Sequence, residues 1–461
     1  MATTIEQYPL YTLLPVGQEV IFSVSNAPIV SNYTKVKIIA EVYISDAPIV
    51  PSSETPVGTF KTTPNNAGVG MFDFRPIIEN YVKSDNTGNN QSTYKGVTNI
   101  LNPFPIHLID EYCRNTDAVR YLAIEFKTEY LDTATNSIVL DDSQDISEQY
   151  TLFNGYLKHT DKINVFESNF GFNTQIFDLS DAVGRYLTNA PTTQYATKND
   201  YGTLGFYAKG NTELSYITFT YTKTDGTTQL QSVNRNWSNG AYSGAASWAR
   251  LQILYFGCFP ANIRNWSSSF RALIDAGTLE SYTIQAFNIG NQPILETITI
   301  NLLCPTLKGY EPIRLTWLNQ WGVWDYYTFN MKSTKSISTK GSTYQQLEGT
   351  WNESIYLPNG YKGGKKAFRV NAMEKISMNT DFVNESESEW FEELINSPEV
   401  YILEGYQEDS TLGVIYSSLH TYATPVRLTT SNYTKKTVAN DKLMQYTFEV
   451  EKSKTLRTQS V

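Results

Sequence analysis

Residues 72–82 read FDFRPIIENYV, and residues 177–187 read FDLSDAVGRYL. Both fit the pattern Phe-Asp-φ-x-x-φ-φ-x-x-Tyr-φ, in which φ is apolar, and the second phrase begins 105 residues after the first. This spacing is about the length of one β-sandwich domain. The repeated phrase therefore predicts two tandem copies of one module. The alternative is coincidence, because short amphipathic helices are common.

Each phrase predicts a short helix lying across the end of a sheet. Asp73 and Asp178 can each cap the helix by accepting a backbone N–H bond at its start, and Pro76 suits the first turn. One face of the first helix is expected to carry the apolar side chains Ile77, Ile78, Tyr81 and Val82.

Alternating apolar and polar residues predict strands along most of the chain. Residues 35–44 and 121–130 alternate in this way, which is typical of half-buried strands. Two alternating runs flank Asp225-Gly226, a strong hairpin signal. Residues 384–398, NESESEWFEELINSP, predict a helix capped at Asn384 or Ser386 and ended by Pro398.

These patterns predict a mainly β fold in three parts. Two tandem β-sandwich-like modules are expected at 1–150 and 151–305, and a C-terminal β-rich domain with one helix at 306–461. A length of 461 residues is too great for one ordinary domain.

Composition narrows the function classes. The net charge of −10 and the isoelectric point of about 5.0 argue against nucleic acid as the main ligand. Only 18% of residues are charged while 32 are Tyr, and such a surface suits contact with proteins or carbohydrate. The N-terminal residues lack the pattern of a signal peptide and no run predicts a membrane span, so we expect synthesis in a cytosol.

No motif for catalysis or metal binding stands out. Cys113, Cys258 and Cys304 have no zinc or disulfide spacing, and the last two lie in apolar runs that predict buried free thiols. The histidines share no ligand spacing, and phosphate-binding and nucleophile-elbow motifs are absent from the sequence. The acidic run 141–148 could offer oxygen ligands to calcium but lacks the spacing of a calcium loop. We therefore assign no catalytic, cofactor-binding or metal residues and expect no enzymatic activity.

Residues 313–331, IRLTWLNQWGVWDYYTFNM, predict a strand, a tight turn at Asn319–Gly322 and a second strand. Its aromatic residues have two interpretations, because such side chains either stack on a partner or fill a core. We expect Trp317 and Tyr327 in the core. The predicted interface residues are Trp321, at an exposed turn, together with Trp324 and Tyr326.

Three windows of the chain resemble virion structural proteins of tailed phages that infect Bacteroidetes, including crAss-like phages. The first is the W-x-N-x-x-G-x-W-D-x-Y-x-F phrase at 317–329, and the second is the F-D-φ-S-x-φ-φ-x-x-Y-φ phrase at 177–187, which 72–82 matches with Arg75 in place of Ser. The third is W-F-x-x-L-x-x-S-P-x-V at 390–400. The resemblance implies a tail, neck or baseplate component without enzymatic activity, made in the host bacterial cytoplasm and located in the virion.

Residues and resemblance together predict a virion structural subunit that forms a homo-oligomeric ring or collar with other tail or neck proteins. The polar segment 84–98 is expected to be ordered by a neighbouring subunit. The first alternative is a receptor- or carbohydrate-binding adhesin. A weaker alternative is a glycan-cleaving enzyme, since paired carboxylates of glycosidases meet only in the folded chain.

Overall fold

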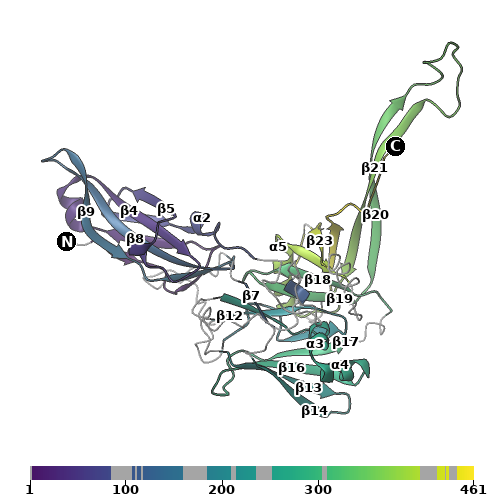
Figure 1. Ribbon diagram of the computed structural model, residues 1–461, viewed down its shortest axis with the longest axis horizontal. Helices are drawn as coiled ribbons and strands as arrows, with labels where there is room; N and C mark the ends of the chain where they lie inside the picture. The colour runs from purple at the N-terminus through teal and green to yellow at the C-terminus, as the bar shows by residue number, and fades with distance from the viewer. Residues whose placement is uncertain are drawn as a thin grey trace. The chain divides into compact units, whose positions relative to one another are not determined.

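The structure is a computed structural model. It describes residues 3–84, 106–108, 112–115, 118–158, 184–208, 214–234, 252–303, 309–404, 423–430, 432–435 and 444–460 (Figure 1). The fold is mainly β, as the alternating patterns predicted. The chain forms two compact units, which are described separately: unit 1 contains Met1–Leu303 and Leu318–Asp325, and unit 2 contains Cys304–Trp317 and Tyr326–Val461.

The N-terminal part of unit 1 is a sandwich of two sheets. The smaller sheet has the order β1 (Thr4–Gln7), β3 (Ile21–Ser25), β6 (Val69–Asp73). The larger sheet has the order β2 (Leu13–Pro15), β10 (Tyr150–Phe153), β8 (Val119–Asp132), β4 (Thr34–Ser45), β5 (Gly58–Thr62), with β9 (Ser137–Ile146) also paired to β8. Neighbouring strands are antiparallel except for β2 and β10, which are parallel.

The two sheets share one hydrophobic core. On β4 the side chains of Val36, Ile38, Ala40 and Val42 are buried, as the alternation of residues 35–44 predicted. The Phe126 ring of β8 lies 5.6 Å from that of Phe22 and 5.7 Å from that of Phe72, both on the smaller sheet. Two short helices, α1 (Ala27–Asn32) and the 3₁₀ helix η1 (Pro51–Ser53), connect strands of this sandwich.

The first copy of the repeated phrase forms the end of β6 and a short helix, α2 (Arg75–Ile78). Asp73 Oδ1 accepts hydrogen bonds from the N–H groups of Arg75 (3.0 Å) and Val20 (3.1 Å), so it holds the helix start against the sandwich. Ile78 and Val82 are buried, whereas Tyr81 is exposed and does not share their face, contrary to expectation. Asp178 lies outside the described residues, so the duplication stays a prediction.

The rest of unit 1 is a second pair of sheets with two helices. The larger sheet has the order β11 (Thr193–Thr197), β17 (Ile298–Leu303), β16 (Leu279–Phe287), β13 (Tyr216–Lys223), β14 (Thr228–Asn234). The smaller sheet has the order β12 (Thr203–Ala208), β15 (Gln252–Gly257), β7 (Tyr112–Asn115). The helices are α3 (Pro260–Trp266) and α4 (Ser268–Asp275), and the 3₁₀ helix η3 (Ile106–Leu108) precedes β7.

Aromatic side chains join these layers. The Phe219 ring on β13 lies 5.6 Å from that of Phe256 on β15, and the Phe270 ring of α4 lies 5.1 Å from that of Tyr221. The predicted hairpin at Asp225-Gly226 is confirmed by the pairing of β13 with β14. Because β7 pairs with β15, residues 112–115 belong to this second sandwich, and the predicted boundary at residue 150 does not describe them.

Unit 2 is built on one eight-stranded sheet. Its order is β19 (Trp324–Phe329), β18 (Ile313–Leu318), β22 (Val400–Leu403), β23 (Ala423–Leu428), β24 (Thr447–Lys452), β21 (Gly364–Asn379), β20 (Ser333–Gln346), with β25 (Arg457–Ser460) also paired to β21. The predicted helix is α5 (Glu385–Asn396), whose N-cap Asn384 forms a capping box with Glu387. The Trp390 ring of α5 lies 4.9 Å from Trp317, and Phe391 lies 5.4 Å from Phe448, so the helix covers the sheet with aromatic side chains.

Strands β20 and β21 form a long hairpin, here called the arm (residues 333–379). Figure 1 shows both strands continuing together beyond the other strands of their sheet. The strands have 14 and 16 residues. β24 pairs only with Lys375–Asn379 of β21, and β25 pairs with Arg369–Ala372. Residues 364–368 pair with β20 alone within the described chain. We call residues 347–363, between the two strands, the tip.

Candidate interaction site

The three predicted interface residues are buried. Trp321, Trp324 and Tyr326 are only 3%, 2% and 5% exposed, so the expectation of an exposed aromatic turn at Trp321 was wrong. Trp317, expected in the core, is fully buried beside α5, and Tyr327 packs against Phe391 at 4.9 Å between ring centroids.

The turn is held inside unit 1 by polar contacts that its sequence does not reveal. Asn319 Oδ1 accepts hydrogen bonds from the N–H groups of Trp321 and Val323 at 3.0 and 3.1 Å, and its Nδ2 donates to the Leu187 carbonyl at 2.9 Å. Trp321 Nε1 donates to Asn189 Oδ1 at 3.2 Å. The indole is therefore already engaged within the chain and is not a candidate anchor for a partner.

Trp324 and Tyr326 are likewise used internally. The buried Trp324 packs edge-on against the buried His107, with 5.3 Å between ring centroids. The Arg314 guanidinium of unit 2 lies 5.1 Å from the centroid of the Tyr326 ring. Within unit 1, Asp325 accepts a 2.6 Å hydrogen bond from the Thr188 hydroxyl. The predicted interface set is thus a packed and hydrogen-bonded part of the fold.

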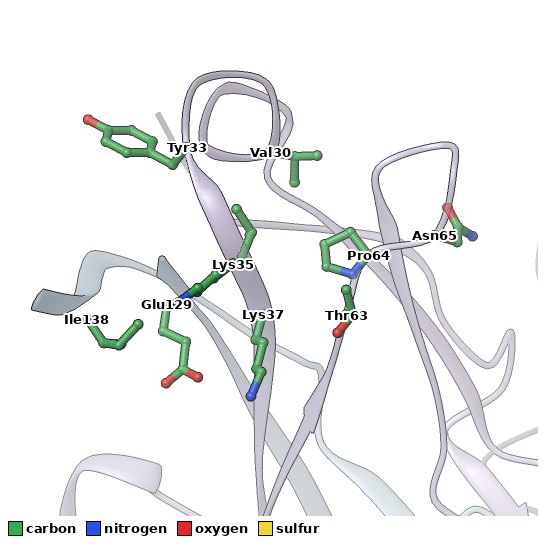
Figure 2. A pocket seen from close by; sticks show the side chains of 10 residues that line it. Val30, Tyr33, Lys35, Lys37, Thr63, Pro64, Asn65, Glu129 and Ile138 are labelled. Atoms are coloured by element: carbon green, nitrogen blue, oxygen red, sulfur yellow. The ribbon is translucent and has the colours of Figure 1, made fainter. Parts of the chain in front are cut away.

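A shallow pocket of about 510 Å³ lies on the N-terminal sandwich, and Figure 2 shows the side chains around it. Its lining includes Tyr33, Lys35, Lys37, Pro64 and Glu129. Lys35 has a φ of 53°, which a non-glycine side chain adopts at a cost, and it lies at an irregularity in the β4–β8 pairing. This open groove with mixed charges has no convergent set of polar groups that would select a ligand.

The arm carries a different kind of surface. Six large apolar side chains of the tip are each more than half exposed: Leu347, Trp351, Ile355, Tyr356, Leu357 and Tyr361. Six such side chains within one short segment exceed the scattered single apolar residues of an ordinary surface, and exposed apolar surface of this kind marks interaction sites. Tyr and Trp provide large contact areas at a small entropy cost, which suits them to binding.

The tip is internally ordered. The Thr350 hydroxyl donates to the Ile355 carbonyl at 2.7 Å and accepts from the Leu357 N–H at 2.8 Å. The Trp351 and Tyr356 rings pack edge to face at 5.8 Å. Gly349 has a φ of 80°, which favours glycine, and a Cβ there would lie 2.3 Å from the Tyr356 ring and would displace it. These contacts order the backbone from Thr350 to Leu357 and place the Trp351 and Tyr356 rings against each other.

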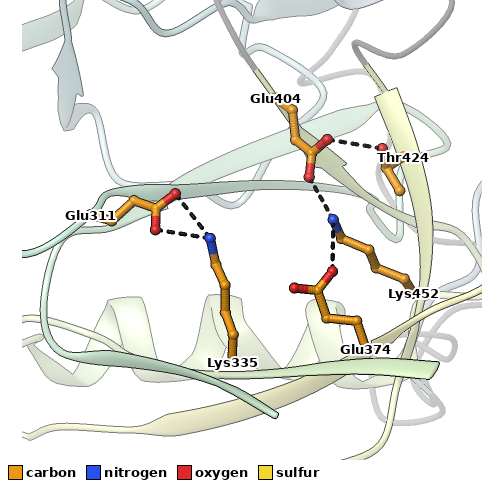
Figure 3. Close-up of polar contacts among 6 residues, drawn as sticks. All are labelled: Glu311, Lys335, Glu374, Glu404, Thr424 and Lys452. Carbon is orange, nitrogen blue, oxygen red and sulfur yellow. Dashed lines mark hydrogen bonds and ion pairs between the residues drawn. The ribbon is translucent and has the colours of Figure 1, made fainter. Parts of the chain in front are cut away.

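Ion pairs lie at the root of the arm, here residues 333–335 and 374–379 (Figure 3). Lys335 Nζ lies 3.0 and 2.9 Å from the two carboxylate oxygens of Glu311. Lys452 Nζ lies 3.1 Å from Glu374 and 3.0 Å from Glu404. Burial alone would lower the pKa of Lys452, but its hydrogen bonds to Glu404 and Glu374 outweigh burial and raise that pKa. The root is therefore neutralised by its own carboxylates.

Beyond the root, the arm is basic. Lys366 Nζ donates to the Tyr361 carbonyl at 2.6 Å, and Arg369 Nε donates to Asn371 Oδ1 at 3.1 Å. Within the described ranges, no ion pair with a carboxylate involves any of the basic side chains Lys340, Lys362, Lys365, Lys366 and Arg369. The strand residues between root and tip, 336–346 and 364–373, are here called the shaft. An exposed aromatic tip on this basic shaft is the strongest candidate interaction site among the described residues.

The described residues hold no group of three or more His, Cys, Asp or Glu side chains that could bind a metal ion. His159 and His420 lie outside those residues. Cys258 is a buried free thiol, as predicted, while Cys304 lies outside the described chain.

Within the described ranges, no helix combines the length and apolar character needed to cross a membrane. The segment 85–98, expected to be ordered by a neighbour, also lies outside the described residues.

Comparisons with known proteins add little to this geometry. No protein-family model matches the chain, and no curated protein matches it. Among solved structures, dimeric latent PorU from Porphyromonas gingivalis aligns with 82% of this chain and 32% of its own, at 8% identity and a TM-score of 0.17. A similarity this low supports no conclusion about fold or function.

Proposed function

We propose that this chain is a structural subunit of a tailed-phage virion, assembling as a ring or collar in the tail, neck or baseplate. In this proposal it is made in the host bacterial cytoplasm and binds copies of itself and other tail or neck proteins. The resemblance of three sequence windows to virion proteins supports the proposal. The observation that carries it is the arm, because its exposed apolar tip and basic shaft need a partner surface to become buried and neutralised.

The β architecture suits such a role. In a ring with cyclic symmetry, the interaction surface of every subunit is buried against a neighbour, and the assembly does not grow without limit. An arm that projects from a sheet is a natural element for such contacts, since it places apolar side chains at a distance from the subunit core. A structural role of this kind does not require an active site.

The test is the composition of purified particles. Phage particles carrying this chain would be purified on a density gradient and analysed by quantitative mass spectrometry against the major capsid protein. We expect several copies per particle, in a constant ratio that matches a closed ring. Absence of the chain from purified particles, or a single copy per particle, would contradict the proposal.

A receptor- or carbohydrate-binding adhesin is the second candidate. The exposed Trp351 and Tyr356 rings favour it, because exposed aromatic faces also stack on sugars. A glycan array probed with the full chain separates the two. An adhesin is expected to retain specific glycans and to lose them on Trp351→Ser, whereas a ring subunit is expected to retain none.

A further inference from the structure

The charge of the arm is opposite to that of the rest of the chain. Residues 333–379 contain seven Lys and Arg and three Glu, a net charge of +4. The whole chain carries −10, which leaves −14 for the remaining residues. The positive charge of the arm is therefore complementary to the net negative charge of the remaining residues of a second copy.

Within the arm, the positive charge that has no carboxylate partner lies next to the tip. Lys335 and Lys375, at the root, pair with Glu311, Glu449 and Glu451. The basic residues nearer to the tip have no such partners in the described chain. The tip itself holds Glu348, Glu353 and Lys362, a net charge of −1, so the positive charge near its apolar side chains comes from Lys340, Lys365, Lys366 and Arg369 of the adjoining strands. Apolar contact at the tip and positive charge beside it are the two components of this binding surface.

The tip is also preorganised. The Thr350 hydrogen bonds order the backbone at Ile355 and Leu357, and the Trp351 ring packs on that of Tyr356. A partner that binds them does not need to supply the free energy of ordering this loop. Near the tip, the β20–β21 register shifts between Ser342 and Thr343, and the Phe368 ring lies 6.4 Å from that of Tyr344, which extends the aromatic surface along the shaft.

We propose that the arm is the subunit-docking element of this protein, and that its tip and basic shaft bind an acidic surface on a second copy of the chain. This inference rests on the proposed function and adds the contact through which subunits join. The contact is heterologous, because the arm of one copy meets a different surface of the next. Heterologous contacts close into a ring when the rotation between subunits permits it.

Self-association of the full chain tests the inference. Sedimentation velocity and mass photometry over a range of concentrations would compare the wild type with two double variants, Trp351→Ser/Tyr361→Ser at the tip and Lys365→Glu/Arg369→Glu on the shaft. Each is expected to raise the dissociation constant by about tenfold or more, as loss of central interface residues does. Matched controls alter exposed residues elsewhere: Leu230→Ser/Ile289→Ser for apolar surface and Lys83→Glu/Lys198→Glu for charge. The controls are expected to change the dissociation constant by less than about twofold.

Cross-linking identifies the partner. A carbodiimide joins Lys directly to neighbouring carboxylates, and mixed ¹⁴N and ¹⁵N chains reveal links between copies. We expect intermolecular links from Lys362, Lys365 or Lys366 to Asp or Glu of the second copy. Links confined to one chain would overturn the inference.

The remaining outcomes are also decisive. A wild-type chain that stays monomeric, or that binds anionic phospholipid vesicles through the tip instead of associating, overturns the inference. So does assembly that the arm variants leave unchanged. None of these outcomes alters the presence of the chain in purified particles, so the proposed function is judged independently.

Discussion

At the scale of single residues, the turn after β18 depends on one glycine. Gly322 has a φ of 77°, and a Cβ placed there would lie 2.3 Å from the Asn154 carbonyl oxygen within unit 1. Gly226, in the β13–β14 hairpin, has a similar φ of 81° but no atom within 4 Å of a Cβ. Both positions favour glycine because of backbone conformation, but only Gly322 also needs the space.

This difference predicts that replacing Gly322 and Gly226 by alanine destabilises the protein by unequal amounts. Gly322→Ala is expected to lower the free energy of unfolding by about 2–4 kcal/mol, since strain and a clash with backbone add. Gly226→Ala is expected to cost only about 1–2 kcal/mol, from the left-handed conformation alone. Urea unfolding followed by tryptophan fluorescence measures both. Equal losses would show that the contact with Asn154 does not matter.

Glu387 is the second residue with a measurable consequence. Its carboxylate accepts a 2.8 Å hydrogen bond from the Asn384 N–H in the capping box of α5. Burial is the largest influence on this carboxyl and raises its pKa. The hydrogen bond from Asn384 lowers the pKa but offsets only part of the rise. A raised pKa means that the folded chain holds this proton more tightly than the unfolded chain does. The charged form therefore costs stability at neutral pH, and this cost disappears as pH falls through the raised pKa towards the ordinary value of 4.5.

Glu387→Gln is thus expected to stabilise the protein at pH 7, because an amide oxygen can keep the capping hydrogen bond without a charge. The gain should shrink as the pH is lowered and vanish below about pH 4, where both chains are neutral at this position. Thermal unfolding from pH 7 to pH 4 measures the trend. The control is Glu385→Gln, an exposed residue in the same first turn, which loses a favourable charge near the helix start and should be slightly destabilising. A destabilising Glu387→Gln at pH 7 would contradict the expectation.

At the scale of elements, the arm is separable from the core of unit 2. Within the tip, Thr350 donates a hydrogen bond to the Ile355 carbonyl and Trp351 packs on Tyr356, while ion pairs of Lys335 and Lys452 lie at the root. Most side chains of β20 are exposed. The stability of unit 2 should therefore come from α5 and the central strands, where Trp317, Phe391 and Phe448 pack.

Replacing the tip tests this separation. Substituting residues 347–363 by Asn-Gly joins Gln346 to Gly364, the last paired residues of β20 and β21, through a two-residue turn of a favoured type. The melting temperature is expected to change by less than about 4 °C, the shift that roughly 1 kcal/mol produces in a chain of moderate size. Circular dichroism provides the measurement. Loss of the cooperative transition would show that the tip is part of the folding core.

At the scale of the whole molecule, opposite charges on the arm and on the remaining chain make salt an informative variable. Screening shortens the range of exposed charges to about 10 Å at 0.1 M salt and about 3 Å at 1 M. Self-association is therefore expected to weaken steadily as sodium chloride rises, while the fold stays intact. Association that strengthens with salt would indicate that apolar burial at the tip dominates and that the charge of the shaft is incidental. Sedimentation velocity at several salt concentrations distinguishes the two.

The sequence by itself determined the elements whose signals are local. Alternation located β4 and β8, Asp225-Gly226 located a hairpin, and the capping box with Pro398 delimited α5. These predictions hold because side-chain periodicity, turn conformation and helix capping depend on residues that are neighbours in sequence. The mainly β class follows from the same signals.

Only the tertiary structure decided which aromatic side chains are exposed. Trp321 follows a polar turn and could have faced solvent, but Asn189 and the turn around Asn319 enclose it within unit 1. Trp351 lies in an equally polar stretch and stays exposed, because the strands that flank it extend beyond the other strands of their sheet. The pairing of β7 with β15 was also hidden from sequence, since strand partners distant along the chain are selected by packing and not by local pattern.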